Sequence, residues 1–308
     1  MESRIDGKTE LIGLMAYPIR HTSSPTMQNE AFRVLGYNYA YLAFEVEQDQ
    51  LKDAVQAIRA LGMRGSNVSM PNKTVVHKYL DHLSPAAELT GSVNTIVNDN
   101  GVLTGYVTDG IGFMDAVKDQ GVDIIGKKIT VVGTGGASTA ICIQAALDGV
   151  REISIFGRKD AFWDKGESIR DKINANTECK AVLYDLDDLL RLKAEIADSV
   201  LFVNATSVGM HPQEGITYIP DSSYFPKEVV VMDVVYAPRV TKTMELAMEA
   251  GCKTFNGLDM MLFQGSAAFE LWTGEPMPIE HMKKFLGIES IEKQDQKEEK
   301  QKENRTER

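Results

Sequence analysis

Two short segments contain residues whose types and spacing could support chemistry. In VSMPNK, residues 68–73, a strand-like run stops at Pro71 and leaves Lys73 just past the break. Taken alone, such a lysine is more often a solvated loop residue than a catalytic one. In GTGGAS, residues 133–138, glycines follow an apolar run and precede a helical pattern. A turn of that kind can hold a pyrophosphate, because the helix N-terminus presents free N–H groups and a positive dipole end.

The glycine turn has the features of a dinucleotide-binding fingerprint. Gly133 permits the tight turn, Gly135 lets the backbone approach the pyrophosphate, and Gly136 and Ala137 begin the helix. Ser138 stands at the third fingerprint position in place of Gly or Ala, which is a mild departure. Glycine turns between strand and helix often serve packing alone, so the hypothesis depends on the fold around the turn.

The residues after the next apolar run, 152–157, bear on which dinucleotide binds. Arg158 and Lys159 could meet the 2′-phosphate of NADP, whereas Asp160 could accept hydrogen bonds from the ribose hydroxyls of NAD. Because Asp160 stands slightly beyond the usual position, it could also be a solvated loop residue. The sequence therefore favours NAD, or the use of both coenzymes.

The elements that must position these residues follow from the hydrophobic pattern. The N-terminal part alternates between the two periodicities, with strands expected at 11–16 and 39–46 and helices at 24–36 and 51–62. Ser24 is a candidate N-cap before Pro25. Residues 93–107 predict a hairpin that turns at Asn100–Gly101.

From about residue 114 the chain becomes a regular βαβ alternation. Continuous apolar runs are separated mostly by helical patterns, and they lie at 128–133, 152–157, 181–185, 199–206 and 229–236. Runs of this kind predict a parallel sheet that is covered on both faces, so the fold class is α/β. A long helix is expected at 258–273, and the charged C-terminal residues are expected to be disordered.

Length and composition exclude several classes of protein. The 308 residues suggest two domains, or one domain with a long insertion, and the net charge of −11 makes nucleic acid a poor partner. The scattered cysteines and histidines show no disulfide framework and no metal-ligand spacing. Without an apolar N-terminal segment or a run of about 18 apolar residues, we expect a cytoplasmic protein that does not cross a membrane.

Taken together, the segments resemble the shikimate dehydrogenase family, and most closely its bacterial quinate/shikimate dehydrogenase branch. The resemblance covers nearly everything from Leu11 to Gly287 and rests on motifs in the family's order: PIRHTSSP, NVSMPNK, GSVNTIV, GYVTDG, GTGGAS, NATSVGM, VVYAP and NGLDMMLFQGS. It implies a substrate domain at 1–113, a Rossmann NAD(P)-binding domain at 114–257, C-terminal helices at 258–287 that return to the substrate domain, and a disordered charged tail at 288–308.

The resemblance also implies the activity: reversible NAD(P)-dependent hydride transfer between shikimate or quinate and the 3-dehydro acid, such as 3-dehydroshikimate. One alternative is a strictly NADP-dependent shikimate dehydrogenase of the aromatic amino acid pathway. A second is a non-catalytic sensor of a nucleotide or a polyol acid, which ranks low because the chain keeps both Lys73 and Asp109. The oligomeric state, a homodimer included, is left open.

The resemblance assigns roles residue by residue. Lys73 matches the family's catalytic lysine and Asp109 its partner carboxylate. The implied substrate ligands are Thr22 and Ser24 at the substrate carboxylate, Tyr41 near it, and Ser69, Asn94 and Gln264 at hydroxyl groups. The implied cofactor contacts beyond the glycine turn are Tyr236 and Gly257 beside the nicotinamide and Arg158 and Asp160 on the adenosine side.

Two positions depart from the family pattern. Thr22 stands where serine is usual, so its extra methyl group could crowd the carboxylate pocket and shift the preference between quinate and shikimate. Val107 stands where an asparagine is common, so any hydrogen bonds of that amide must be met otherwise.

Structural roles remain open for several of these residues. Ser24 could act only as an N-cap, Asn94 could stabilise a strand end, and Asp109 could cap a helix at 111–119. Gln264 could be a surface residue, and His21 and His211 are taken as structural or surface residues. In the reaction, Lys73 would donate to the carbonyl during reduction and act as a base in reverse. Since a neighbouring carboxylate favours the charged amine, the pair could act mainly by polarising the carbonyl.

Overall fold

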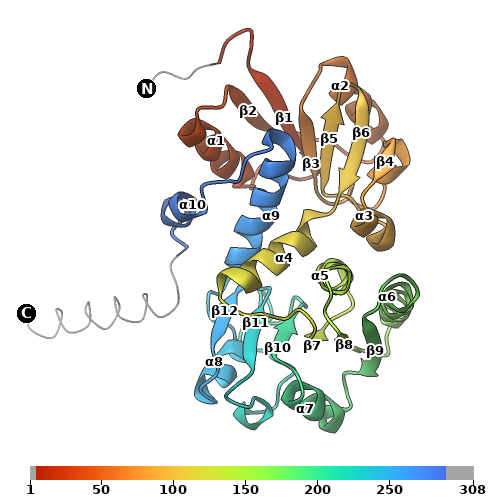
Figure 1. Ribbon diagram of the computed structural model, residues 1–308, viewed down its shortest axis with the longest axis vertical. Coiled ribbons are helices and arrows are strands. Elements are labelled where there is room, and N and C mark those ends of the chain that lie inside the picture. The colour runs from red at the N-terminus through yellow and green to blue at the C-terminus, as the bar shows by residue number, and fades with distance from the viewer. Residues whose placement is uncertain (1–4, 289–308) are drawn as a thin grey trace, which may run out of the picture.

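The computed structural model describes residues 5–288, which form two six-stranded sheets with helices on both faces of each (Figure 1). The strands are β1 (Glu10–Ala16), β2 (Tyr39–Glu45), β3 (Gly65–Val68), β4 (His82–Leu83), β5 (Thr95–Asp99), β6 (Val102–Tyr106), β7 (Lys128–Val132), β8 (Glu152–Gly157), β9 (Lys180–Asp185), β10 (Leu201–Asn204), β11 (Val230–Asp233) and β12 (Thr254–Asn256). The helices are α1 (Ser24–Leu35), α2 (Leu51–Ala60), α3 (Pro85–Thr90), α4 (Thr108–Asp119), α5 (Gly136–Leu147), α6 (Trp163–Asn176), α7 (Leu189–Ala197), α8 (Lys242–Glu249), α9 (Gly257–Thr273) and α10 (Ile279–Leu286), with 3-10 turns η1 (Val76–Tyr79) and η2 (Ser222–Tyr224).

The N-terminal sheet is mixed and has the strand order β2-β1-β3-β5-β6-β4. Its first three strands are parallel, and the β5–β6 hairpin runs antiparallel to β3. At the hairpin turn, Asn100 and Gly101 have φ of 55° and 95°. Two consecutive positive φ values are typical of the type I′ turn, which matches the twist of paired strands. The hairpin predicted from the Asn-Gly pair is therefore confirmed.

The second sheet is parallel throughout, with the order β9-β8-β7-β10-β11-β12. Numbered by their appearance in this half, the strands follow the 3-2-1-4-5-6 order of the Rossmann fold. All five residues of β7 are buried, as a strand covered by helices on both faces requires. Connections from β7 and β10 lead to opposite faces, and a ligand crevice forms at such a switch point. The α/β fold class is confirmed.

Helix α9 joins the two halves. It begins directly after β12 and runs back against the N-terminal sheet beside α1, while α4 crosses it between the sheets (Figure 1). At its far end the indole Nε1–H of Trp272 donates to the carbonyl oxygen of Ile96, at 3.0 Å. The ring of Phe269 stacks on Phe32 of α1, with 5.1 Å between the ring centroids. These contacts fix α9 to the N-terminal sheet, so its cavity-facing residues have a fixed position.

The domain boundaries derived from the sequence stay predictions. The boundary after residue 113 falls within α4, and the boundary at 257 coincides with the first residue of α9. The predicted disorder of 288–308 lies outside the described residues apart from Ile288. Across residues 5–288, no helix has both the length and the apolar character that crossing a bilayer would require.

Candidate active site

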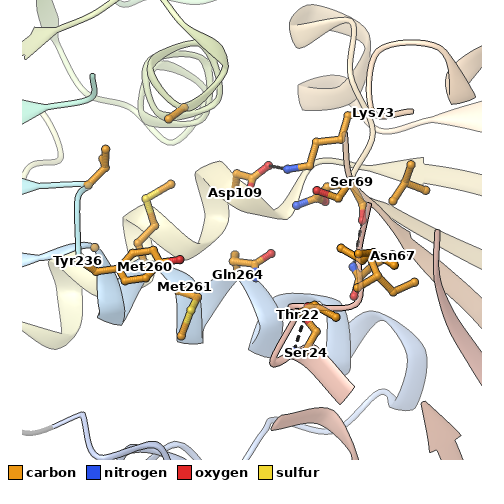
Figure 2. A pocket seen from close by; sticks show the side chains of 17 residues that line it. Thr22, Ser24, Asn67, Ser69, Lys73, Asp109, Tyr236, Met260, Met261 and Gln264 are labelled. Atoms are coloured by element: carbon orange, nitrogen blue, oxygen red, sulfur yellow. Dashed lines mark hydrogen bonds and ion pairs between the residues drawn. The ribbon is translucent and has the colours of Figure 1, made fainter. Parts of the chain in front are cut away.

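Lys73, in the loop after β3, and Asp109, in α4, form an ion pair. The Nζ of Lys73 donates to Oδ2 of Asp109 at 2.8 Å, and each side chain keeps 25% of its surface exposed (Figure 2). Lys73 follows β3, and its loop is anchored because the fully buried Asn72 donates to the carbonyl oxygen of Val46 at 2.8 Å. The amide of Gln48 also donates to the carbonyl oxygen of Pro71, at 2.9 Å. The lysine is thus held at the edge of a cavity.

Asp109 belongs to the first turn of α4 and is not its N-cap. The helix begins at Thr108, and the N-cap position is Val107, which makes no side-chain capping bond. The first backbone N–H of the helix, that of Thr108, is buried and donates to Oδ1 of Asn94 at 2.8 Å. The alternative in which Asp109 caps the helix is therefore wrong. Val107 is instead buried, packing with Ala86 and Ala140.

The hydroxyl groups of Thr22 and Ser24 lie together at the start of α1. Oγ1 of Thr22 donates to Oγ of Ser24 at 3.1 Å and accepts the backbone N–H of Ser24 at 3.2 Å. The N-cap position of α1 is Ser23, so the alternative in which Ser24 serves only as the N-cap is wrong. Ser24 Oγ thus accepts from Thr22, and Ser24 also makes a hydrogen bond with the hydroxyl of Tyr41 behind it.

These side chains line one cavity of about 310 Å³ between the two sheets. Lys73, Ser69, Asn67, Thr22 and Ser24 lie on the side of the N-terminal sheet, and Tyr236, Met260 and Met261 lie on the opposite side (Figure 2). Of the predicted residues, the cavity wall includes Thr22, Ser24, Ser69, Lys73, Asn94, Asp109, Ala137, Tyr236, Gly257 and Gln264. Its apolar lining comes from Leu14, Ile19, Val68, Val234, Met260 and Met261. A small molecule in the cavity could thus make both hydrogen bonds and apolar contacts.

Tyr41 does not line this cavity. Its side chain is 0% exposed, and its hydroxyl donates to Oδ1 of Asn67 at 2.7 Å. Burial raises the pKa of Tyr41, and a hydrogen bond with Ser24 works against that rise, so the phenol stays a neutral donor. Asn67, which sequence analysis missed, lies on the cavity wall in its place. The signal was available, because side chains two apart along a strand share a face and Ser69 follows Asn67 at that spacing.

Gln264 reaches the cavity because α4 and α9 cross very closely. A Cβ added to Gly112 of α4 would collide with the backbone N of Gln264, so only glycine permits the approach. The side chain of Gln264 lies with Met260 and Met261 along the face of α9 that borders the cavity (Figure 2). Within the described part of the chain, its amide makes no hydrogen bond, so both its donors and its acceptor can meet a ligand.

A second cavity of about 650 Å³ follows the carboxyl ends of the Rossmann strands. The glycine turn Gly133–Gly136 forms one side of it. Ala137, Val234 and Tyr236 belong to both cavity walls, so the two spaces adjoin. The turn stands at the switch point of the sheet, and α5 begins at Gly136. These residues fit a dinucleotide, with its pyrophosphate at the helix N-terminus.

Ser138 lies on neither cavity wall. Its side chain is fully buried, and its hydroxyl donates to the carbonyl oxygen of Gly133 at 2.7 Å. The hydroxyl thus ties the first turn of α5 to the glycine turn. The departure from Gly or Ala at this fingerprint position is accommodated by a hydrogen bond inside the protein.

On the adenosine side, the charged residues after β8 have different surroundings. Among the residues that line the second cavity, Arg158 is the one cation and Asp160 the one acid. The guanidinium of Arg158 lies 5.0 Å from the ring centroid of Tyr218. Oδ1 of Asp160 accepts the backbone N–H of Phe162 at 2.8 Å. Lys159 is not on the cavity wall and pairs with Asp185 at 3.0 Å.

Other candidate groups contribute nothing to these cavities. His21 and His211 are both exposed, as expected, and Nδ1 of His211 lies 3.0 Å from Oε1 of Glu214. Within residues 5–288, no group of three or more His, Cys, Asp or Glu side chains could hold a metal ion.

The ligand crevice of the Rossmann sheet adjoins a polar cavity that contains a paired lysine and carboxylate. This combination defines the class of the protein as a dinucleotide-dependent oxidoreductase that acts on a CH–OH group. Family models refine that class: the shikimate dehydrogenase substrate-binding domain matches residues 14–96, and the shikimate 5′-dehydrogenase C-terminal domain matches residues 257–284. The chain belongs to the shikimate dehydrogenase family, which confirms the resemblance at that level.

Individual relatives agree with this assignment. A curated relative from Listeria monocytogenes serotype 4b, named shikimate dehydrogenase (NADP(+)), is 61% identical over 92% of this chain and 97% of its own. A crystal structure of shikimate 5-dehydrogenase from Listeria monocytogenes with shikimate and NAD matches with a TM-score of 0.91 at 60% identity, covering 93% and 99% of the two chains. Quinate dehydrogenase from Corynebacterium glutamicum with NAD matches with a TM-score of 0.80 at 29% identity, covering 91% and 99%.

Proposed function

We propose that this protein catalyses the reversible oxidation of shikimate to 3-dehydroshikimate, with NADP(H) as its coenzyme. The observation that carries the proposal is the Lys73–Asp109 pair, which lies on the wall of a small polar cavity next to the dinucleotide crevice. The names of the relatives at high identity point to the same reaction. This is the alternative that the sequence ranked second.

The cavity suits a small cyclic acid that carries several hydroxyl groups. Lys73 is the one cation on its wall and is already paired with Asp109, so the substrate carboxylate would be bound by neutral donors. The hydroxyl groups of Thr22 and Ser24 lie on the wall at one end of the cavity, and because hydroxyl protons rotate they can be turned toward a carboxylate. Asn67 supplies no further donor, since both of its N–H groups are used within the protein. Hydrogen bonds from neutral donors to a carboxylate are charge-assisted and hold it without an ion pair.

Asn94 and Gln264 would bind the hydroxyl groups of the ring. Oδ1 of Asn94 already accepts from Thr95 and from the backbone of Thr108, and Nδ2 donates one N–H to Oγ1 of Thr108 at 3.0 Å. The second N–H of Nδ2 is therefore the part left for a ligand. Gln264 can both donate and accept. Asn94 would therefore meet an oxygen acceptor, while Gln264 would bridge hydroxyl groups that differ in orientation.

In the reaction, the residues of this chain would stabilise the proton at the reacting oxygen and orient the substrate toward the dinucleotide. When bound, the dinucleotide supplies the hydride acceptor. Lys73, held in place by Asp109, would donate a hydrogen bond to the reacting oxygen and stabilise it as it changes between hydroxyl and carbonyl. Tyr236, Gly257 and Met260 lie on the wall next to the dinucleotide crevice and would limit how the ring of the substrate faces it.

The sequence favoured NAD or the use of both coenzymes, and the preference for NAD is not supported. Arg158 can pair with a 2′-phosphate, and one oxygen of Asp160 is already used by the backbone of Phe162. The Listeria relative at 61% identity is named for NADP(+), although the crystal structure at 60% identity contains NAD. We therefore propose NADP(H), with NAD(H) as a weaker coenzyme.

Quinate oxidation is the second candidate. It is favoured by the structural match to a quinate dehydrogenase and by Thr22, whose methyl group changes the carboxylate end of the cavity. The test is steady-state kinetics with shikimate and quinate against both coenzymes. The proposal is supported if kcat/KM for shikimate with NADP exceeds the values for quinate and for NAD. Absence of turnover of either acid with either coenzyme would refute it. Asp160→Ala should weaken the binding of NAD more than the binding of NADP. Light scattering can show whether the protein forms a homodimer.

A further inference from the structure

An acidic side chain with no role so far lies buried at the carboxyl end of the Rossmann sheet. Asp233 is the last residue of β11, and its side chain is 0% exposed. Its partners among the described residues are all neutral donors. Burial raises the pKa of Asp233, and hydrogen bonds from Asn204 and Thr241 work against that rise. A buried carboxyl group without a cation is costly unless hydrogen bonds satisfy it, so the hydrogen bonds of Asp233 matter for this part of the fold.

The hydrogen bonds of Asp233 connect three segments. Nδ2 of Asn204, the last residue of β10, lies 3.0 Å from both carboxyl oxygens. The backbone N–H of Val235 donates to Oδ1 at 3.0 Å. The hydroxyl of Thr241, the N-cap of α8, donates to Oδ2 at 2.7 Å. A single carboxyl group thus links the ends of two neighbouring strands to the helix that follows.

Asn204 carries the connection into the loop after β10. Its Oδ1 accepts the hydroxyl of Thr206 at 2.7 Å, and its Nδ2 donates to the carbonyl oxygen of Val208 at 3.1 Å. Residues 205–208 line the dinucleotide crevice. Residues 234–237 also line it, and Val234 and Tyr236 extend to the substrate cavity. Both loops that line the crevice are therefore fixed by the same buried pair, and the second loop reaches the junction with the substrate cavity.

We propose that Asp233, acting through Asn204, is a positioning residue that holds these two loops at the spacing the nicotinamide end of the coenzyme requires for hydride transfer. The inference rests on the proposed dehydrogenase function. Asp233 lies on neither cavity wall, so it acts on the wall residues and not on a ligand. A displacement of about 1 Å between reacting groups can cost about 100-fold in rate, so a small shift of either loop would be visible in kcat.

The test compares variants that remove the network to different degrees. Asp233→Ala removes every acceptor, whereas Asp233→Asn keeps one oxygen and should restore part of the function. Thr241→Val removes one donor and retains the shape of the side chain. Ser154→Ala is the matched control, because Ser154 is a fully buried hydroxyl of the same sheet that donates to Oε2 of Glu195, away from both loops.

Four quantities are measured on protein that is folded at the assay temperature: kcat, KM for shikimate, the deuterium isotope effect on kcat, and the Kd of 2′,5′-ADP, which lacks the nicotinamide. We expect Asp233→Ala to lower kcat by at least about tenfold and to raise the isotope effect, with KM for shikimate and Kd for 2′,5′-ADP changed by less than about threefold. Asp233→Asn and Thr241→Val should show the same pattern with smaller changes. Ser154→Ala should leave kcat unchanged.

Two outcomes would overturn the inference. One is a kcat within about twofold of the unsubstituted protein in folded Asp233 variants; the other is a loss of 2′,5′-ADP affinity as large as the loss of kcat. If Asp233→Ala does not fold, Asp233→Asn and Thr241→Val test the inference by the same criteria. Absence of turnover in the unsubstituted protein would refute the proposed function itself, and the inference with it.

Discussion

Replacing Lys73 by methionine tests the proposed chemistry most directly. Methionine keeps most of the length of the side chain and removes the amine that pairs with Asp109. A positioned acid or base contributes about 10²–10⁴-fold to the rate of such a step. We therefore expect kcat to fall by that factor, which corresponds to about 2.7–5.5 kcal/mol in activation free energy. Coenzyme affinity should change little, since Lys73 does not line the dinucleotide crevice.

The same substitution should cost little stability. Both partners of the ion pair are a quarter exposed, and pairs with access to solvent contribute about 0.2–1 kcal/mol to the free energy of unfolding. A loss of activity that exceeds the loss of stability by several kcal/mol cannot be attributed to unfolding. The measurements are steady-state kinetics, thermal unfolding and titration of the coenzyme by fluorescence.

Lys172→Met is the matched control. The Nζ of Lys172 donates to the carbonyl oxygen of Leu89 at 2.8 Å, and Lys172 lines neither cavity. This variant should retain full activity. A Lys73→Met protein with kcat within about threefold of the unsubstituted one would remove the amine from the mechanism. Combining Lys73→Met with Asp109→Asn should cost less than the product of the two single effects, because the residues act as a unit.

Three further predictions concern coenzyme choice, substrate choice and acid stability. Arg158→Ala should raise KM for NADP by at least about tenfold and KM for NAD by less than about threefold, with a smaller effect in Tyr218→Ala; kinetics with equal losses for both coenzymes would contradict this. Thr22→Ser should change the ratio of kcat/KM for quinate and shikimate, and an unchanged ratio would make the methyl group irrelevant. Hydrogen bonding by Arg33 lowers the pKa of Glu30 from 4.5 to about 2, with His281 contributing less. The stabilisation from Glu30 should therefore be present above pH 4.5 and be lost as the pH falls toward 2, so Glu30→Gln should lower Tm near neutral pH and have little effect near pH 2.

The sequence predicted most of the fold because its strongest signals are local. Apolar runs marked the strands of the parallel sheet, and Asn100–Gly101 marked the hairpin turn correctly. The first residue of α1 was harder to predict, because Thr22, Ser23 and Ser24 are all plausible N-cap residues. The backbone angles that make Ser23 the N-cap residue are not visible in the one-dimensional pattern.

Part of the candidate site depends on contacts between distant segments, and sequence reasoning erred there. The sequence left open that Asp109 caps a helix, yet the acceptor at the start of α4 comes from Asn94, which directly precedes the first strand of the hairpin. Asn67 was overlooked although it shares a face with Ser69, and Tyr41 was assigned to the cavity that Asn67 lines. These errors concern which of two neighbouring polar groups faces the ligand, and that choice is made by packing.

The side chains of this site belong to the fold as much as to the cavity. The carbonyl oxygen of Asn94 holds the start of α4, and the first turn of α4 carries Asp109 to Lys73. Replacing Asn94 by aspartate would keep that oxygen and place a second carboxylate on the cavity wall near Asp109. An acidic substrate would then face two carboxylates and one ammonium, so its binding should weaken even where the helix is undisturbed. The neutral amide at this position therefore serves the charge balance of the cavity as well as the local geometry, in which its Nδ2 donates to Oγ1 of Thr108 at 3.0 Å.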